Sequence, residues 1–305
     1  MGEVNYIRIK QKDNYVTILS HYICDKPVAS VLILHGMAEH QGRYTAFAKY
    51  LVSMGYDVFI YNHRGHGTDK KIKELGYIAP NKGYKLLVED AINISNYINQ
   101  HNRSDKLFLI GHSMGSLISR NIIQRYNKYN GVILIGTSNP LNFVTKIGLI
   151  LSFVIKKYRG PKYLSPFLNR LIFGSKNYTS LANRTQFDWL TRRHGVVGAY
   201  INDPYCGFIC SISFYSDLLM LVSNASKKSL NKQIQKSMPI FIISGEKDPV
   251  GGYGIDIKRL YNSYKQLGLT NVSLKLYPDC RHELLNELNY DEVYSDINSW
   301  ILEQK

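Results

Sequence analysis

The stretch LFLIGHSMGSLISR, residues 107–120, joins an apolar run to a helical pattern through the pentapeptide Gly-His-Ser-Met-Gly. Residues 107–110 form a continuous apolar segment, which is typical of a strand that is covered on both faces. A helical spacing begins at Ser116, so Ser113 falls in a sharp turn between the strand and the helix. The opening stretch therefore predicts a serine held at the end of a buried strand.

Two glycines flank this serine. Side chains at Gly111 and Gly115 would clash with neighbouring backbone in such a sharp turn. The hydroxyl of Ser113 is then exposed above the strand, and the backbone N–H of Met114 points into the same space. This context predicts a nucleophile with an oxyanion donor beside it, rather than a serine that only caps a helix.

Apolar runs elsewhere in the chain predict the rest of the sheet. Two alternating segments within residues 6–21 predict an antiparallel hairpin around Lys12-Asp13-Asn14. The other runs alternate with helical patterns, which predicts an α/β protein with a mostly parallel central sheet flanked by helices. The expected buried strands lie at 31–34, 58–61, 107–110, 132–135, 240–243 and 272–277, and the first expected helices at 44–54, 84–99 and 116–126.

The alternation of strand and helix stops near Pro140 and resumes near Pro239. Between them, residues 139–238 contain helical periods and no run that resembles a buried strand. A segment inserted between two strands emerges at one edge of the sheet. We therefore expect residues 139–238 to form a helical lid, called the predicted lid below. The core of the fold is then made of residues 1–138 and 239–305.

A serine hydroxyl needs a base within hydrogen-bond reach to act as a nucleophile. Two histidines follow Ser113 in the chain. His194 lies within the predicted lid, whereas His282 follows the last expected strand in the stretch YPDCRHELL, from where a loop reaches the serine. His282 is therefore the expected base.

An acid should lie between the serine and the histidine in chain order. Asp248 follows the expected strand 240–243 in the stretch FIISGEKDPV, where a buried carboxylate would orient the imidazole of His282. Glu246 on the same loop is one alternative. Asp279 is another, although it lies close to His282 in sequence for the expected geometry. Asp248 is the preferred acid.

A second oxyanion donor should come from the loop after an earlier strand. The stretch LILHGMAEH, residues 32–40, places a glycine directly after the strand, and Gly36 permits a tight turn. The backbone N–H of Met37 is the expected donor, together with that of Met114. Glu39, His40 and Arg43 are expected to tie this loop to its surroundings by hydrogen bonds.

With these residues assembled, the chain resembles the α/β-hydrolase fold, and more narrowly the monoacylglycerol lipase and lysophospholipase branch of the serine hydrolases. The resemblance implies the same assignments, with Ser113, Asp248 and His282 as the triad and Met37 and Met114 as oxyanion donors. It also implies no cofactor. The matching stretches are HGMAEHQGRY at 35–44, YNHRGHG at 61–67, GHSMGS at 111–116, SGEKDPVG at 244–251 and CRHELLNE at 280–287.

The chain departs from this family at two positions. The family often has Asp where this chain has Asn62, which lies away from the expected triad. It has a small residue where this chain has Met37, whose side chain would narrow the entrance near the oxyanion site. The second departure affects which substrate is accepted.

These residues predict a serine hydrolase that cleaves a monoacylglycerol or lysophospholipid-type ester through an acyl-enzyme, with no metal or cofactor. The pair His63-x-x-His66 lacks an evident third metal ligand. Within the same fold, the alternatives are a short-chain carboxylesterase and an aminopeptidase for small residues. The aminopeptidase would need an acidic group for the substrate amine, for which Asp203 or Asp217 is available.

The formal net charge is +15, and its excess is concentrated in the predicted lid. Residues 139–238 contain 14 Lys and Arg against three Asp. Such a field attracts phosphate, in nucleic acid or in anionic lipid. A basic nucleic-acid-binding protein with a vestigial hydrolase core is therefore an alternative of another class. No motif of interleaved aromatic and basic residues supports it, so no nucleic acid is expected as a partner.

The stretch NFVTKIGLILSFVIKKYRGPKY, residues 142–163, predicts a helix that is apolar almost all round and ends in basic residues. It is too interrupted by polar residues to span a bilayer, but it could lie on an anionic membrane surface. The alternative is a helix that packs against the sheet and lines an acyl pocket.

The N-terminal stretch MGEVNYIRIKQ has no signal-peptide pattern, and the four cysteines show no paired framework. The expected location is cytoplasmic, with peripheral membrane contact as a candidate.

Overall fold

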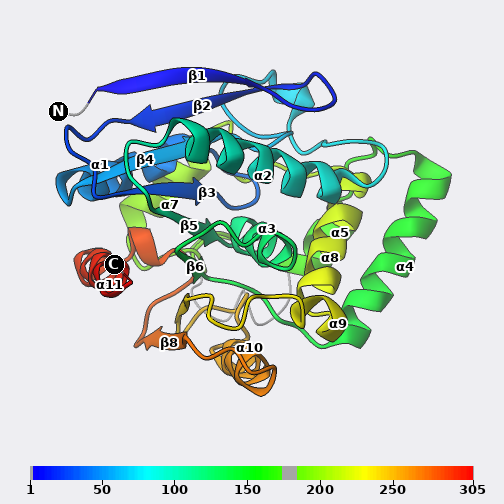
Figure 1. Ribbon diagram of the computed structural model, residues 1–305. Coiled ribbons are helices and arrows are strands. Elements are labelled where there is room, and N and C mark those ends of the chain that lie inside the picture. The colour runs from blue at the N-terminus through cyan, green and yellow to red at the C-terminus, as the bar shows by residue number, and fades with distance from the viewer. Residues whose placement is uncertain (1–2, 174–183, 305) are drawn as a thin grey trace.

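An eight-stranded sheet crosses the molecule in the computed structural model, which describes residues 3–173 and 184–304 (Figure 1). The strand order is β1-β2-β4-β3-β5-β6-β7-β8. β2 pairs antiparallel with both β1 and β4, and all other neighbours are parallel. The strands are β1 (Val4–Lys10), β2 (Val16–Tyr22), β3 (Ala29–Leu34), β4 (Tyr56–Tyr61), β5 (Leu107–His112), β6 (Gly131–Ile135), β7 (Ile240–Gly245) and β8 (Val272–Tyr277).

Helices cover both faces of the sheet, as the alternation of strands and helices predicted (Figure 1). The fold class, a mostly parallel sheet between helices, is confirmed. The helices are α1 (Thr45–Ser53), α2 (Gly83–His101), α3 (Met114–Ile123), α4 (Asn142–Arg159), α5 (Pro166–Phe173), α7 (His194–Asn202), α8 (Ile212–Ala225), α9 (Lys228–Asn231), α10 (Ile255–Gln266) and α11 (Tyr290–Glu303), with short 3-10 turns η1 (Gln41–Tyr44), η2 (Ile72–Glu74) and η3 (Leu284–Asn286).

Successive residues of the central strands point to opposite faces, and both faces are buried. In β5, Leu107 and Leu109 pack in one hydrophobic cluster with α2, α3, α8 and α10. Phe108 and Ile110 pack in a second cluster with α1 and α11 on the other face. Burial on both sides explains why these strands are continuous apolar runs in the sequence.

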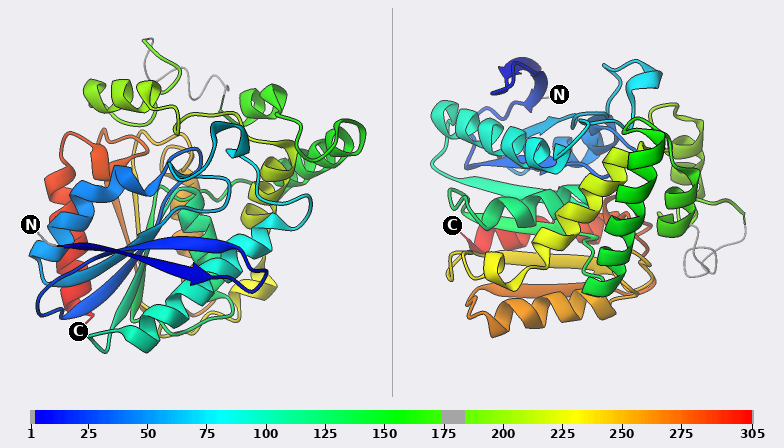
Figure 2. Two further views of the ribbon diagram at one scale, coloured as in Figure 1. Left: turned by 90° about the horizontal axis from the view of Figure 1, so that it is seen from above. Right: turned by 90° about the vertical axis from the view of Figure 1, so that its right-hand side faces the viewer.

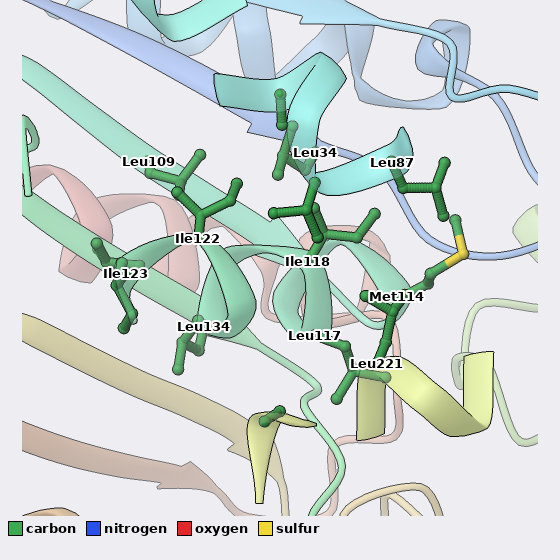
Figure 3. Close-up of a cluster of buried hydrophobic side chains, with 14 of the residues drawn as sticks. Leu34, Leu87, Leu109, Met114, Leu117, Ile118, Ile122, Ile123, Leu134 and Leu221 are labelled. Atoms are coloured by element: carbon green, nitrogen blue, oxygen red, sulfur yellow. The ribbon is translucent and has the colours of Figure 1, made fainter. Parts of the chain in front are cut away.

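The helix after the serine turn is anchored by its apolar side chains. Met114, the first residue of α3, is 2% exposed and packs in the same cluster as Leu87 and Leu221 (Figure 3). Full burial of one such side chain stabilises a fold by about 1.5–3 kcal/mol. The start of α3 is therefore firmly fixed relative to β5. The expected helix start at Ser116 was wrong by two residues, because Met114 and Gly115 are already helical and only Ser113 lies outside the helix.

The segment 139–238 is helical in the part that the structure describes, with only an isolated bridge between Leu164 and Ser211 as extended pairing there. Figure 2 shows α4, α5 and α7, in green, gathered on one side of the molecule. By contrast, α8 packs against α2 and α3. Residues 174–183 of the predicted lid lie outside the described residues. The division of the chain into core and lid stays a prediction.

Two further observations concern the chain as a whole. Within the described ranges, no helix has both the length and the apolar character needed to cross a bilayer. All four cysteines are free thiols, and three of them are buried.

Candidate active site

The turn that carries Ser113 has a strained backbone. Ser113 has φ 52° and ψ −116°, a conformation that non-glycine residues rarely adopt and that costs of the order of 1–3 kcal/mol. Its N–H donates to the carbonyl of Ile135 at the end of β6, at 2.9 Å. A side chain at Gly115 would overlap the carbonyl oxygen of Leu34, and one at Gly111 would overlap the hydroxyl of Ser119. The neighbouring strands and α3 therefore hold the serine in this strained turn.

The residues predicted from the sequence converge at one edge of the sheet. Met37 follows β3, Ser113 follows β5, Asp248 follows β7 and His282 follows β8, and these four strands run parallel (Figure 1). Their carboxyl ends therefore meet at the same edge, as expected for open parallel sheets. A cavity of about 850 Å³ opens there, and Met37, Ser113 and His282 all line it.

His282 and Asp248 form a buried pair. The Nδ1 of His282 lies 3.0 Å from Oδ2 of Asp248, and Asp248 is fully buried. The carboxylate also accepts hydrogen bonds from the hydroxyl of Ser244 at 3.2 Å and from the amide of Val250 at 2.9 Å. A carboxylate only accepts, so Nδ1 carries the proton and Nε2 of the neutral ring is free to take one up.

The pKa of His282 is set by two opposing effects. Burial lowers the pKa because it disfavours the charged imidazolium. The negative charge of Asp248 and its hydrogen bond, together with the charges of Glu283 and Glu39, raise it by more, so the net pKa lies above the ordinary value of 6.5. The pair therefore stabilises the imidazolium that a general base becomes.

The structure does not bring the alternative residues to this pair. His194 is exposed at the start of α7. Glu246 and Asp279 are both exposed on loops, whereas Asp248 is buried against His282. Of the candidates weighed for the base and the acid, Asp248 and His282 are the two that meet.

Two backbone amides beside Ser113 have no acceptor. Among the described residues, the N–H groups of Met37 and Met114 donate no hydrogen bond. Met114 is the first residue of α3, a position whose N–H has no partner within the helix. The loop of Met37 lies against the serine, because a Cβ built on Gly36 would be 3.3 Å from the Cβ of Ser113. Both amides are thus available beside the serine.

A buried ion-pair network supports the loop at residues 35–44, called the oxyanion loop below. Arg43 donates to Glu39 at 2.5 Å and to both oxygens of Glu283 at 2.7 Å. Burial raises the pKa of Glu39, but the charge of Arg43, the hydrogen bond and charge of His112 and the charge of His35 together outweigh this and hold the pKa well below its usual range. Because Glu283 follows His282 in the chain, Arg43 connects the oxyanion loop to the loop of the histidine. The prediction that Glu39 and Arg43 tie this loop down is confirmed.

Two supports of the site were not predicted from the sequence: the ion pair of Glu283 with Arg43, and the contacts that the predicted lid makes with the loop of His282. The carbonyl of Trp189 accepts from the amide of His282 at 3.4 Å, and that of Leu190 from the amide of Glu283 at 2.7 Å. The ring of Trp189 lies 5.1 Å from that of His282. No sequence signal connects residues almost a hundred positions apart, except that Glu283 directly follows the expected base.

One cluster among the described residues has the composition of a metal site. His40, Asp203 and Cys206 place ligand atoms within 4.8 Å of one another. However, Nδ1 of His40 accepts from the amide of Gly42 at 3.1 Å, so Nε2 carries the proton and donates to Asp203 at 2.8 Å. A metal on Nε2 would break that bond. The cluster is explained as a hydrogen-bonded link between the oxyanion loop and the end of α7.

The histidine pair considered from the sequence, His63 and His66, is not arranged as two free ligands. Both ring nitrogens of His66 are engaged with backbone groups. Burial lowers the pKa of both rings, which keeps them neutral, and that of His66 to about 4. His66 is therefore a structural acceptor within the site.

The cavity has both apolar and polar walls. Most of the bulky apolar side chains come from the predicted lid, and the polar ones include an arginine of α5. They are Phe187, Trp189, Leu190, Phe208 and Ile209 on the apolar side, and Asn169, Arg170, Thr185 and Gln186 on the polar side.

Comparisons of the sequence and of the fold with known proteins agree with one another. A family model described as "Serine aminopeptidase, S33" matches residues 25–289. The chain is 26% identical over 282 residues to the monoglyceride lipase of Rattus norvegicus, covering 90% of this chain and 82% of that protein. It is 23% identical over 273 residues to phospholipase YtpA of Bacillus subtilis, covering 88% and 93%. Its fold matches a thermostable carboxyl esterase from Bacillus coagulans, solved with glycerol, with a TM-score of 0.90, 24% identity and 99% coverage of both chains.

Proposed function

The chain belongs to the S33 serine aminopeptidase family of α/β-hydrolases, and from this membership we propose that it is a serine hydrolase of monoacylglycerol or lysophospholipid-type esters. The observation that carries the proposal is the buried pair of His282 and Asp248, at 3.0 Å, beside a cavity that Ser113 also lines. The relatives named monoglyceride lipase and phospholipase support the ester class.

In this proposal the reaction has two steps. Nε2 of His282 takes the proton of Ser113 as its Oγ attacks the ester carbonyl carbon. The N–H groups of Met37 and Met114 stabilise the negative oxygen of the tetrahedral intermediate. The imidazolium then protonates the leaving alcohol oxygen as the ester bond breaks. In the second step His282 deprotonates a water, which attacks the acyl-enzyme and releases the fatty acid.

The cavity supports a substrate with an acyl chain and a polar head. Its volume of about 850 Å³ falls in the upper part of the range typical of small-molecule sites. The aromatic and aliphatic walls from the predicted lid suit a hydrocarbon chain. The polar wall near Asn169 and Arg170 suits a glycerol or phosphoglycerol head group.

The carboxylates near the cavity favour an ester over an aminopeptidase substrate. The two acids that line it, Glu39 and Glu283, are both paired with Arg43. Of the acids considered from the sequence, Asp203 is bonded to His40, and Asp217 is buried and does not line the cavity. Neither acid is placed to bind the ammonium group of a peptide.

Hydrolysis rates on matched substrates test this proposal. Long-chain monoacylglycerol, lysophospholipid, a short-chain ester and an aminoacyl amide would be compared for the wild type and Ser113→Ala. We expect long-chain esters to give the highest kcat/KM, and Ser113→Ala to abolish hydrolysis. Faster cleavage of the short ester would assign the chain to the carboxylesterases, and faster cleavage of the amide to the peptidases.

The exposed face of α4 supports the proposal that the chain contacts a membrane. The helix packs against α8, and its buried residues are the small ones, Thr145, Gly148 and Ser152. Ile155 is partly buried and also packs against the core. Gly148 permits close packing, because a Cβ there would lie 3.0 Å from Leu219. Most of the large apolar side chains of α4 face outwards, which differs from the expected alternative of a helix packed on the sheet. The exposed ones are Phe143, Val144, Ile147, Ile150, Phe153 and Val154 on α4, with Leu164, Phe167 and Leu171 next in the chain.

We propose that this face docks on an anionic lipid surface. An exposed apolar stripe of this kind marks an interaction site, and Lys157, Arg159 and Lys162 lie at its end. Each basic residue near an anionic surface contributes about 1 kcal/mol. Docking there would bring lipid substrate to the predicted lid. The free thiols fit a reducing compartment, which supports the expected location at a cytoplasmic membrane surface.

Vesicle co-sedimentation tests the docking surface. The wild type should bind vesicles that contain phosphatidylglycerol, and binding should fall with added salt and in the double variant Ile150→Ser/Phe153→Ser. Ile255→Ser is the matched control, because Ile255 is 65% exposed on α10. Equal binding by the double variant and the control would refute the surface. A wild type that dimerises and binds no vesicles would assign the surface to a second copy of the chain.

A further inference from the structure

The backbone of Ala38 is strained, and hydrogen bonds hold the peptide groups before and after this residue. Ala38 directly follows Met37 in the oxyanion loop and has a φ of 50°, in the left-handed region that favours glycine. Three hydrogen bonds fix the backbone of Ala38. Its N–H, in the peptide group shared with Met37, donates one, and its carbonyl, in the next peptide group, accepts two. A strained residue that the surroundings hold in place points to a functional constraint.

The predicted lid supplies both bonds to the carbonyl. The hydroxyl of Tyr200, on α7, donates to the oxygen of Ala38 at 2.9 Å. The amide of Gly207, in the loop after α7, donates to the same oxygen at 2.9 Å. Tyr200 is buried, and its ring lies against the guanidinium of Arg43 at 4.8 Å. The position of α7 therefore determines the orientation of the peptide group that follows Ala38.

The core supplies the bond to the N–H. Nε2 of His66 accepts from the amide of Ala38 at 3.1 Å. Nδ1 of the same ring donates to the carbonyl of Arg64 at 3.0 Å, which fixes the tautomer with Nε2 unprotonated. The ring has no exposed surface and lies beside Phe208 and Phe214. It can therefore act as a rigid, neutral acceptor.

We propose that Tyr200 and His66 are positioning residues that set the direction of the Met37 amide, so that the seating of α7 controls the oxyanion site. The inference rests on the proposed function, in which this amide stabilises the tetrahedral intermediate. An amide that donates to developing charge lowers the barrier only if it is already oriented. A movement that displaces α7 releases the Ala38 carbonyl, so the backbone of Ala38 can relax from its strained φ. The Met37 N–H, in the peptide group two before that carbonyl, then loses its fixed direction.

Tyr200→Phe tests the contribution of the lid with little change in packing. The variant keeps the ring and removes one hydroxyl. We expect kcat to fall about tenfold with KM unchanged, the size of effect that the loss of one hydrogen bond gives. Tyr56→Phe is the matched control, because Tyr56 is also buried and its hydroxyl donates to Asn298 at 2.9 Å, but Tyr56 does not line the cavity as Tyr200 does. The control should keep the wild-type kcat.

A transition-state analogue separates positioning from substrate binding. An alkyl trifluoromethyl ketone forms a tetrahedral adduct with a serine, and its inhibition constant should rise in Tyr200→Phe by the same factor as kcat/KM falls. A wild-type inhibition constant and kcat would overturn the proposal. A higher KM with unchanged kcat would also overturn it, because it would place Tyr200 in ground-state binding.

His66 is tested by rescue. His66→Leu keeps the apolar contacts and removes the acceptor, so kcat should fall tenfold or more. His66→Gln supplies a side-chain oxygen that can accept from Ala38, and should recover most of the loss. Urea unfolding of both variants shows whether they are folded in the assay. Equal loss of kcat in two folded variants would overturn the role of His66.

The same assays distinguish this inference from the proposed function. If Ser113→Ala keeps full turnover, the proposed function fails. If Ser113→Ala is inactive while Tyr200→Phe and both His66 variants match the wild type, only the positioning role fails.

Discussion

Acidification should destabilise the fold through its buried neutral histidines, and His66→Gln measures the effect of one of them. Burial lowers the pKa of His66 to about 4 and that of His35 to about 3, against an ordinary value of 6.5. A buried base with a lowered pKa stays neutral in the folded chain, while the unfolded chain takes up a proton below pH 6.5. Its contribution to stability is therefore full above pH 6.5 and is lost as the pH falls towards the folded pKa.

The size of this loss follows from proton linkage. At pH 5.0 the unfolded imidazole is almost fully protonated, whereas the folded His66 is protonated in about a tenth of molecules. Integrated from pH 7.5 to pH 5.0, the difference lowers the free energy of unfolding by about 2 kcal/mol for His66 alone. His35 should lose a similar amount, which remains in the variant.

Urea unfolding at the two pH values, followed by tryptophan fluorescence, measures this difference. Gln at position 66 cannot titrate but can still accept from Ala38. The wild type should lose about 2 kcal/mol more than His66→Gln between pH 7.5 and pH 5.0, with the same dependence on urea. Equal losses in the two proteins would refute the reasoning that His66 is buried in its neutral form.

Three other changes have definite expected outcomes. Asp248→Asn should lower kcat about 10⁴-fold, the loss typical when the acid of such a triad becomes an amide. It should also move the acid limb of the kcat/KM pH profile to lower pH, because Asp248 raises the pKa of His282. An unchanged pH profile would exclude a catalytic pair of Asp248 and His282. Gly115→Ala should lower the free energy of unfolding by about 3 kcal/mol or more, since its Cβ would overlap the carbonyl of Leu34; wild-type stability in urea would contradict this. Arg170 lines the cavity, so Arg170→Met should lower kcat/KM about fivefold on lysophosphatidylglycerol relative to monoacylglycerol. Arg125→Met is the control, because Arg125 is exposed and does not line the cavity; equal changes on both lipids in Arg170→Met would remove the arginine from head-group binding.

The fold could be predicted from the sequence because its central strands are buried on both faces. Each then appears as an uninterrupted apolar run, such as residues 107–110 or 240–243, with a helical pattern between runs. Parallel strands also place their carboxyl ends together, so the loops after β3, β5, β7 and β8 could be assigned to one site. That is why the loop of Asp248 could be assigned to the site, whereas burial distinguishes Asp248 from Glu246 on the same loop.

The orientation of α4 could not be predicted in the same way. Apolar residues occupy almost the whole circumference of this helix, so their spacing does not say which side packs. The packed side is instead the stripe of Thr145, Gly148 and Ser152, whose small side chains permit close approach to α8. The spacing of these three residues was visible in the sequence, but small and polar residues give no hydrophobic pattern from which a packed side could be predicted.

The supports of the site were hidden for a different reason. Arg43 and Glu283 are 240 positions apart, and Tyr200 reaches Ala38 from 162 positions away. Such contacts depend on how the predicted lid is placed over the sheet edge, which local patterns do not encode. The nucleophile, base and acid each follow a strand and can be located from it, whereas the residues that hold them in position cannot.

Labelling with a fluorophosphonate probe tests the central claim most directly, because the probe reacts only with a serine that a neighbouring base activates. The wild type should be labelled at one residue, Ser113, and Ser113→Ala should remain unlabelled while unfolding in urea like the wild type. Equal labelling of the two proteins, or a folded wild type that does not react, would contradict the account.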